Sequence, residues 1–297
     1  MIPYVRDFDF EYGRCDQVSP LIRRIIARNP GPFTFTGTGT YIIGRGEVAV
    51  IDPGPLDEVH LDALLEELEG ETVTHILVTH THMDHSPLAP PLAIATDAPV
   101  YAARPPAPDD EPGVVVEEGD DGLFRPDVEI GDGDRFEGPG WTIETVATPG
   151  HASNHLAFAL LEENALFSGD HVMGWSTTVV SPPDGDMGLY YASLDRVAAM
   201  RFATLWPTHG PPITDPDPYL AAYKAHRLAR EAQILDAVRA GHGTVSEIVP
   251  VVYAGVDQRL WPAAAHSALA HLIHLERSGV ISRDGPEEPR SRFHLAP

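Results

Sequence analysis

Cysteine is almost absent from this chain of 297 residues, and long hydrophobic runs are missing altogether. Cys15 is the only cysteine, so no disulfide bond can form within the chain. No run approaches the roughly eighteen continuous apolar residues of a membrane span, and we therefore expect no membrane crossing. The first twenty residues are charged and contain no apolar core of a secretory signal, which favours a cytoplasmic protein.

Basic charge is also scarce. Lys224 is the only lysine, and the formal net charge is −24. Residues 1–218 carry eleven Lys and Arg against thirty-six Asp and Glu, whereas residues 219–297 carry nine against eight. Nucleic-acid binding draws most of its affinity from basic side chains that neutralise phosphates. The composition therefore favours a small-molecule substrate over a nucleic-acid partner, although local arginine clusters can work against this trend.

A group of metal-binding side chains lies directly behind a short apolar strand. The strand is Ile-Leu-Val at residues 76–78, and the loop after it carries His80, His82, Asp84 and His85. A strand of this kind delivers its loop to the edge of a sheet, where the side chains can surround one point. Imidazole and carboxylate ligands suit zinc, iron or manganese. Because a single tetrahedral ion does not need so many ligands from one loop, the motif predicts two metal ions.

Three further strand ends carry one metal-binding side chain each. Short apolar segments run into turns that contain Gly or Pro and that present His151, Asp170 and His209. Gly and Pro supply the unusual backbone angles and the fixed geometry that such turns require. We therefore expect four strand ends to converge on one site. The chain has no Gly-x-Ser-x-Gly nucleophile motif and no phosphate-binding loop, so metal ions must provide the hydrolytic machinery.

The pattern resembles the metallo-β-lactamase superfamily, and within it the hydroxyacylglutathione-hydrolase-like members that carry a full His-x-His-x-Asp-His motif. The resemblance covers roughly residues 30–215, including strands at 40–43 and 48–51 and the turn 52–55. It implies an α/β fold, an αβ/βα sandwich. It also implies a ligand set: His80, His82 and His151 for the first metal, Asp84, His85 and His209 for the second, and Asp170 as the bridge. Residues 169–175 and the C-terminal extension look closest to the lactamase-beta-2-like branch, whose animal members cleave single-stranded RNA.

The resemblance implies a binuclear zinc-dependent hydrolase, with iron or manganese as the other metals to consider. A metal-bridging hydroxide would attack an ester, lactone, thioester or β-lactam, and Asp84 would orient the attacking water or shuttle its proton. A metal-dependent endoribonuclease acting on single-stranded RNA is the first alternative; the branch implies it and the charge opposes it. An iron-dependent sulfur dioxygenase is the second.

Side chains near the ligands in sequence are the next candidates. Trp175, Thr178 and Tyr190 follow Asp170 along the chain, and we expect them to contact the substrate. His155 and His171 are either general acids or hydrogen-bonding partners of the ligands, and the second role is favoured. Asp52 is expected to organise the turn beneath the site.

The chain divides at the run 215–218, Asp-Pro-Asp-Pro, into a catalytic domain (1–218) and a helical, winged-helix-like module (219–297). Two helices and a hairpin are expected in the module, which we assign to packing or homo-oligomerisation rather than to nucleic-acid binding. The first of these helices should bury one face, formed by Leu228, Ala232, Leu235 and Val238.

In the catalytic domain, a helix with Asp57 as its N-cap precedes the metal-binding loop. Most of residues 103–140 is interpreted as a solvated excursion, with a lid over the site as the alternative.

Overall fold

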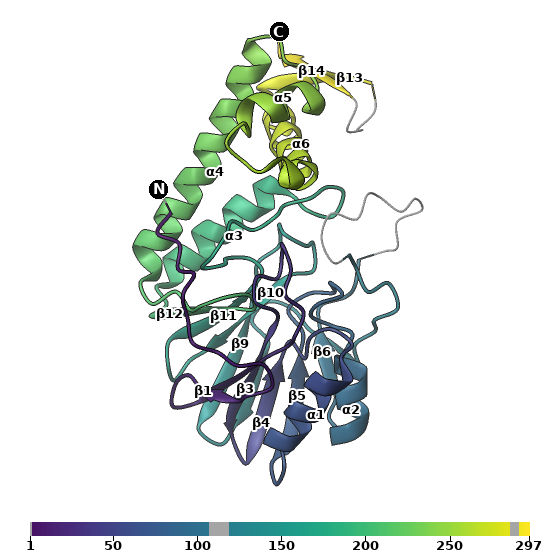
Figure 1. Ribbon diagram of the computed structural model, residues 1–297, viewed down its shortest axis with the longest axis vertical. Helices are drawn as coiled ribbons and strands as arrows, with labels where there is room; N and C mark the ends of the chain where they lie inside the picture. The colour runs from purple at the N-terminus through teal and green to yellow at the C-terminus, as the bar shows by residue number, and fades with distance from the viewer. Residues whose placement is uncertain (1, 107–118, 286–290) are drawn as a thin grey trace.

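Two β-sheets lie face to face at the centre of the fold (Figure 1). The computed structural model describes residues 2–106, 119–285 and 291–297. Within these residues the first sheet contains seven strands in chain order: β1 (Asp16–Gln17), β2 (Ile22–Ile26), β3 (Gly39–Arg45), β4 (Glu47–Ile51), β5 (Thr72–Leu77), β6 (Val100–Ala102) and β7 (Val128–Glu129). The second contains five, in the order β12 (Thr204–Pro207), β11 (Ala165–Gly169), β10 (Leu156–Leu160), β9 (Trp141–Ala147) and β8 (Arg135–Gly138).

Strand β3 shows why both faces of the sheets are apolar. Tyr41 and Ile43 point toward the second sheet and share a core with Phe158 and Phe167. Ile42, between them, points the other way and packs under the helices. Successive side chains of a strand alternate between faces, so a strand buried on both sides reads as a continuous apolar run.

Helices cover the outer face of each sheet and complete the predicted αβ/βα sandwich. Helices α1 (Glu58–Glu67) and α2 (Ala89–Thr96) cover the first sheet, and α3 (Met187–Met200) covers the second (Figure 1). The predicted N-cap of α1 is confirmed, because the Asp57 carboxylate accepts hydrogen bonds from the backbone of Val59 and His60.

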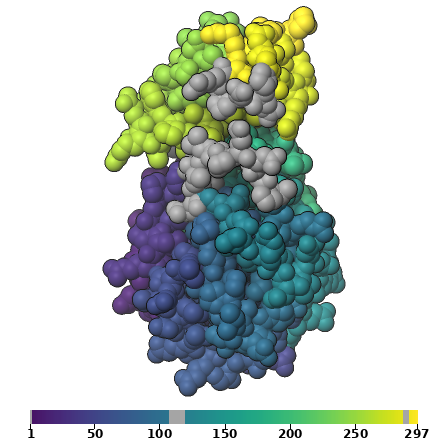
Figure 2. Space-filling model, turned by 90° about the vertical axis from the view of Figure 1, so that its right-hand side faces the viewer, coloured from purple at the N-terminus to yellow at the C-terminus, as the bar shows by residue number. Residues whose placement is uncertain are grey.

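The C-terminal module stands at one end of the sandwich (Figures 1 and 2), and a long helix joins the two (Figure 1). This helix, α4 (Pro216–Arg239), is followed by α5 (Val245–Val252), the 3₁₀ turn η1 (Gln258–Leu260), α6 (Trp261–Arg277) and the hairpin β13 (Ile281–Asp284) and β14 (Arg292–Leu295). The module has its own apolar core, which includes Ile248, Leu272 and Phe293. The two predicted helices and the hairpin are present, and α5 lies between the helices as a third one that was not predicted.

Helix α4 buries only part of the predicted face, at Val238, together with a face that was not predicted. Leu228 is exposed, whereas Tyr219, Tyr223 and Arg227 are buried. The apolar pattern missed this face because two tyrosines and an arginine form it, each of which donates a hydrogen bond to a backbone carbonyl group. Tyr219 and Tyr223 belong to the core beneath α3, so the predicted boundary after residue 218 falls beside residues that the catalytic domain buries.

Two other expectations concern the excursion at 103–140 and the lack of a membrane crossing. The excursion at 103–140 lies partly at 107–118, outside the described residues, so the solvated and lid interpretations stay predictions. No helix in the described part of the chain is both long and apolar enough to span a membrane.

Candidate metal centre

Each predicted metal ligand follows the C-terminal end of a strand. Strands β9 and β11 are both antiparallel to β10, and β12 is parallel to β11, so these three strands end at the same edge of the second sheet. The segments after them carry His151, Asp170 and His209, while the loop after β5 carries the other ligands. The strand directions thus explain how residues up to 129 positions apart in the chain meet at one place.

Asp52 ties these loops together. It follows β4, is fully buried, and accepts hydrogen bonds from the Thr79 amide (2.8 Å), the Thr79 hydroxyl (2.8 Å) and the Thr208 hydroxyl (2.9 Å). Its Oδ2 also lies 2.8 Å from Nδ1 of His85. A carboxylate at this position holds Nδ1 of the imidazole protonated and leaves Nε2 as the ligand atom. The expected role of Asp52 beneath the site agrees with these contacts.

Three histidines bring one nitrogen each to a common point. Nε2 of His80 lies 3.0 Å from Nδ1 of His82, and Nε2 of His151 lies 3.2 Å from each of them. The other nitrogen of His151 donates to the carbonyl oxygen of Val179 at 2.8 Å, which leaves Nε2 with its lone pair. This trio, His80, His82 and His151, matches the first predicted ligand set.

A second trio of Asp84, His85 and His209 lies beside the first. Oδ2 of Asp84 is 3.0 Å from Nε2 of His209 and 3.5 Å from Nε2 of His85. Asp170 stands between the trios: its Oδ1 is 3.5 Å from Nε2 of His209, and its Oδ2 is 4.0 Å from Nε2 of His151. One oxygen of Asp170 therefore faces each trio.

The polar atoms at this point are suited to a cation. Nε2 of His85, Nε2 of His209 and Oδ1 of Asp170 are buried and form no well-aligned hydrogen bond within the described residues. Buried polar atoms without partners are costly unless another group binds them. Imidazole nitrogens and carboxylate oxygens are the donor set of zinc and of other first-row metals. The arrangement fits metal ions on both sides of Asp170.

The charges of the second trio support ionised carboxylates. Burial alone would raise the pKa of Asp170 and of Asp84, but His85 and His209 lower both. Burial alone would lower the pKa of His209, but Asp170 and Asp84 outweigh this effect and raise it to about 10. Both carboxylates are thus ionised, as metal coordination requires, and a bound cation would take the place of the proton that His209 carries.

His155 and His171 lie behind the ligands. Nε2 of His155 accepts the amide hydrogen of Asp170 at 3.1 Å, and its Nδ1 lies 2.8 Å from the Thr148 hydroxyl. His171 is fully buried, and burial lowers its pKa to about 3. Only glycine fits at position 169 in this packing, because its φ is +52° and an added Cβ would come within 2.5 Å of Nε2 of His155. These contacts agree with the favoured hydrogen-bonding role for His155.

The three predicted substrate residues differ in their positions. Trp175 is partly exposed and lines a cavity beside the module. Thr178 is buried, and its hydroxyl donates to the carbonyl oxygen of Asp170 at 2.8 Å. Tyr190 is fully buried, and its hydroxyl donates to the carbonyl oxygen of His171 at 2.8 Å. Thr178 and Tyr190 therefore support the backbone of the site, and Tyr190 offers no surface to a substrate.

Comparison with known proteins agrees with this geometry. A model of the metallo-beta-lactamase superfamily matches residues 34–209, and a model of the beta-lactamase associated winged helix domain matches residues 244–288. The chain belongs to the metallo-beta-lactamase superfamily. It is an enzyme of that superfamily with a C-terminal winged helix domain, and both the predicted resemblance and the predicted fold are confirmed.

Similar proteins cover nearly the whole chain. The lactamase-like protein adaB of Aspergillus niger is 32% identical over 100% of this chain and 96% of its own length. The atrochrysone carboxyl ACP thioesterase of Aspergillus chevalieri is 34% identical over 82% of this chain and 76% of its own. The beta-lactamase-like protein 2 homolog of Caenorhabditis elegans is 29% identical over 90% and 88%. A crystal structure of a beta-lactamase domain protein from Burkholderia ambifaria, 22% identical, gives a TM-score of 0.77 over 98% of this chain and 96% of that one.

Sequence reasoning missed two groups that position the site. The carbonyl oxygen of Val179 orients His151, and no side-chain pattern reports on a backbone acceptor. Arg227 donates to the carbonyl oxygen of Thr178 from α4 and is buried. A signal for it existed, because Tyr219, Tyr223 and Arg227 recur every four residues along one helix face.

Proposed function

We propose that the protein is a binuclear zinc hydrolase that acts on thioesters, within the wider group of esters, lactones, thioesters and β-lactams that the ligand set can serve. The observation that carries the binuclear assignment is the position of Asp170 between two trios of ligand atoms. The thioester assignment draws on the relative named as an ACP thioesterase, which is 34% identical over 82% of this chain.

Each residue of the metal centre has its own role in the proposed reaction. His80, His82 and His151 would hold one ion, Asp84, His85 and His209 the other, and Asp170 would bind both. When bound, such ions supply Lewis acidity and lower the pKa of water to around 7. Asp84 would orient the attacking water and accept its proton. Asp52 keeps His85 in the tautomer that presents Nε2.

The test is metal analysis of the purified protein combined with hydrolysis of a matched panel. We expect close to two zinc ions per chain and turnover of benzoyl-N-acetylcysteamine, a small thioester, in preference to a lactone, a β-lactam and single-stranded RNA. His242→Ala is the control, because His242 lies in the turn after α4, apart from both trios. Wild-type protein that retains no metal would overturn the binuclear assignment.

The two alternatives give different outcomes in the same experiment. Cleavage of single-stranded RNA without thioester hydrolysis would favour the endoribonuclease, and the beta-lactamase-like protein 2 homolog of C. elegans is a relative whose name resembles that of this branch. The net charge of −24 opposes it. Iron in place of zinc, with oxygen consumption on a persulfide substrate, would favour the sulfur dioxygenase.

A further inference from the structure

A cavity lies where the winged helix module meets the catalytic domain. Its volume is about 260 Å³, and aromatic side chains form part of its wall: Phe33 from the segment before β3, Trp175 from the segment after β11, and Tyr253 from the end of α5. Helix α4 contributes Arg227 and Arg230. Both parts of the molecule are thus needed to build this cavity.

The cavity touches the metal centre through two consecutive residues. Thr178 and Val179 both line it. The hydroxyl of Thr178 donates to the carbonyl oxygen of Asp170 at 2.8 Å, and the carbonyl oxygen of Val179 accepts from Nδ1 of His151 at 2.8 Å. Only the backbone of Thr178 and Val179 therefore separates a molecule in the cavity from two of the predicted ligands, Asp170 and His151.

Charge in the cavity is opposite to that of the chain. The sequence has 44 Asp and Glu against 20 Lys and Arg, yet no Asp or Glu is among the described residues that line the cavity. Arg230 lies over the Tyr253 ring, with 4.3 Å between the guanidinium carbon and the ring centroid, and donates to the carbonyl oxygen of Val252. The wall is basic and aromatic.

Arg227 is the least satisfied of these groups. Its exposed fraction is 4%, and it donates to the carbonyl oxygen of Thr178 and lies 5.3 Å from the Tyr190 ring centroid. Its Nε has no hydrogen-bond partner, and no carboxylate forms an ion pair with it among the described residues. A buried charge without a counter-charge is costly, and such groups are kept where a ligand completes them.

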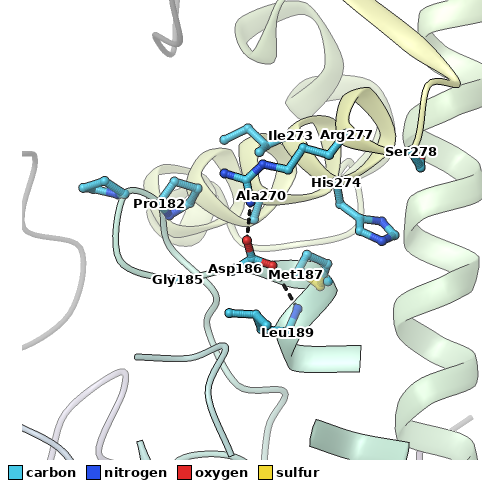
Figure 3. A pocket seen from close by; sticks show the side chains of 12 residues that line it. Pro182, Gly185, Asp186, Met187, Leu189, Ala270, Ile273, His274, Arg277 and Ser278 are labelled. Atoms are coloured by element: carbon cyan, nitrogen blue, oxygen red, sulfur yellow. Dashed lines mark hydrogen bonds and ion pairs between the residues drawn. The ribbon is translucent and has the colours of Figure 1, made fainter. Parts of the chain in front are cut away.

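A second cavity provides the contrast. It has a volume of about 470 Å³ and lies between the start of α3 and α6. There Arg277 reaches across to Asp186, and the dashed line in Figure 3 marks their ion pair. The arginine in that cavity already has a carboxylate partner, so of these two cavities only that of Arg227 has a cation left to neutralise.

We propose that the cavity of Arg227 is a substrate subsite that binds an aromatic carboxylate, with the carboxylate on the Arg227 guanidinium and the ring between Trp175 and Tyr253. The assignment rests on the proposed hydrolase function, because the cavity would take a carboxylate carried by an aromatic part of the substrate, separate from the thioester carbonyl that is hydrolysed at the metals. Guanidinium recognises carboxylate through paired, charge-assisted hydrogen bonds, and the aromatic wall suits a planar group.

Isothermal titration of the purified full-length protein with benzoate, benzamide and inorganic phosphate tests the subsite. We expect benzoate to bind at least about tenfold more tightly than benzamide, its neutral isostere, as for one hydrogen bond to a charged group. Arg227→Gln should remove that difference while benzamide binding changes little. Equal benzoate affinity in the wild type and R227Q, as expected if benzoate binds only at the metals, would overturn the assignment. Phosphate binding without benzoate binding would overturn it as well.

A second pair of variants leaves Arg227 in place, in case R227Q fails to fold. Ser267 lines the cavity from α6 and is partly exposed. Ser267→Asp adds a carboxylate to the wall of the cavity that Arg227 also lines, and Ser267→Asn is the neutral variant of matched size. Benzoate should bind several-fold more weakly to S267D than to S267N, because the new carboxylate competes for the guanidinium. Equal affinities would contradict the subsite.

Failure of the subsite and failure of the hydrolase function give separate results. Thioester hydrolysis with benzoate binding that does not depend on Arg227 would sink the subsite alone. Benzoate binding that depends on Arg227, in a protein that hydrolyses no thioester, would sink the proposed function and leave the anion-binding cavity standing.

Discussion

Two clusters of histidine and carboxylate occur in this molecule, and they are built in opposite ways. At the metal centre, ring nitrogens from several loops converge on one another, and some carboxylate and imidazole atoms lack partners. In the C-terminal module, His271 and His274 both direct Nδ1 at the single carboxylate of Glu231, at 3.0 and 2.9 Å. The first arrangement requires a cation to join its acceptors, whereas the second already pairs both Nδ1 atoms with a carboxylate and leaves only Nε2 of His271 buried without a partner among the described residues.

The difference shows what distinguishes a metal centre from a structural cluster of the same residue types. Composition does not decide, since both clusters contain histidine and carboxylate. The direction of the nitrogen atoms decides, because a nitrogen that faces another nitrogen at about 3 Å needs something between them. Substitutions in the two clusters should therefore have different effects.

Asp170→Ala should produce the largest effect. Its two oxygens face the two trios, so their loss weakens both metal sites at once. We expect the metal content to fall from close to two ions per chain to one or fewer, and hydrolysis to fall by about 100- to 1,000-fold, as when a principal charge-stabilising group is removed. Plasma mass spectrometry and initial rates measure the two losses. Retention of two ions would show that Asp170 is not the bridge.

Asp84→Asn should affect turnover more than metal content. Asparagine keeps the shape of the side chain but loses the negative charge and the ability to accept a proton. We expect kcat to fall on the order of a hundredfold, as for a positioned acid–base group. Circular dichroism should show an unchanged fold. A variant with both metals and near wild-type turnover would mean that the role of Asp84 has been misassigned.

Glu231→Gln should leave the metal content unchanged, whatever the concentration of zinc, because Glu231 lies in the cluster of the C-terminal module. Its carboxylate accepts from two histidines, and replacing it leaves buried donors poorly matched. We expect a loss of about 1–3 kcal/mol in the free energy of unfolding, measured by urea denaturation. A fall in metal content without loss of stability would show that the two clusters are not independent.

The smallest effect concerns pH. Burial alone would raise the pKa of Glu231, but His271 and His274 lower it below its ordinary value of 4.5. A carboxyl group with a lowered pKa in the folded state stabilises the fold above 4.5, and this contribution is lost as the pH falls through the lowered value. The difference in unfolding free energy between the wild type and Glu231→Gln should thus narrow as the pH falls below 4.5. A difference that does not narrow below pH 4.5 would rule out the ionised carboxylate of Glu231 as its source.

The sequence alone could predict the parts of the site that depend on contiguous motifs. Four of the seven predicted ligands lie in one loop, and the others stand at recognisable strand ends, so the two trios could be anticipated. Long-range contacts to backbone atoms could not be. Tyr190 lies close to Asp170 in sequence and is expected at the substrate on that ground, yet packing of α3 against the second sheet buries it. Arg227 escapes a search for apolar faces because an arginine interrupts the apolar pattern, although its helix face is buried.

The carboxylate of Asp52 has a consequence for how the enzyme responds to stress. It joins the loop after β5 to Thr208, which follows the outermost strand of the other sheet, so a single group clasps both halves of the sandwich. Loosening of either sheet withdraws a donor from it and frees the ring of His85. Bound metal would then be released when the sheets of the whole domain separate. It would not be released by local unfolding of the site alone.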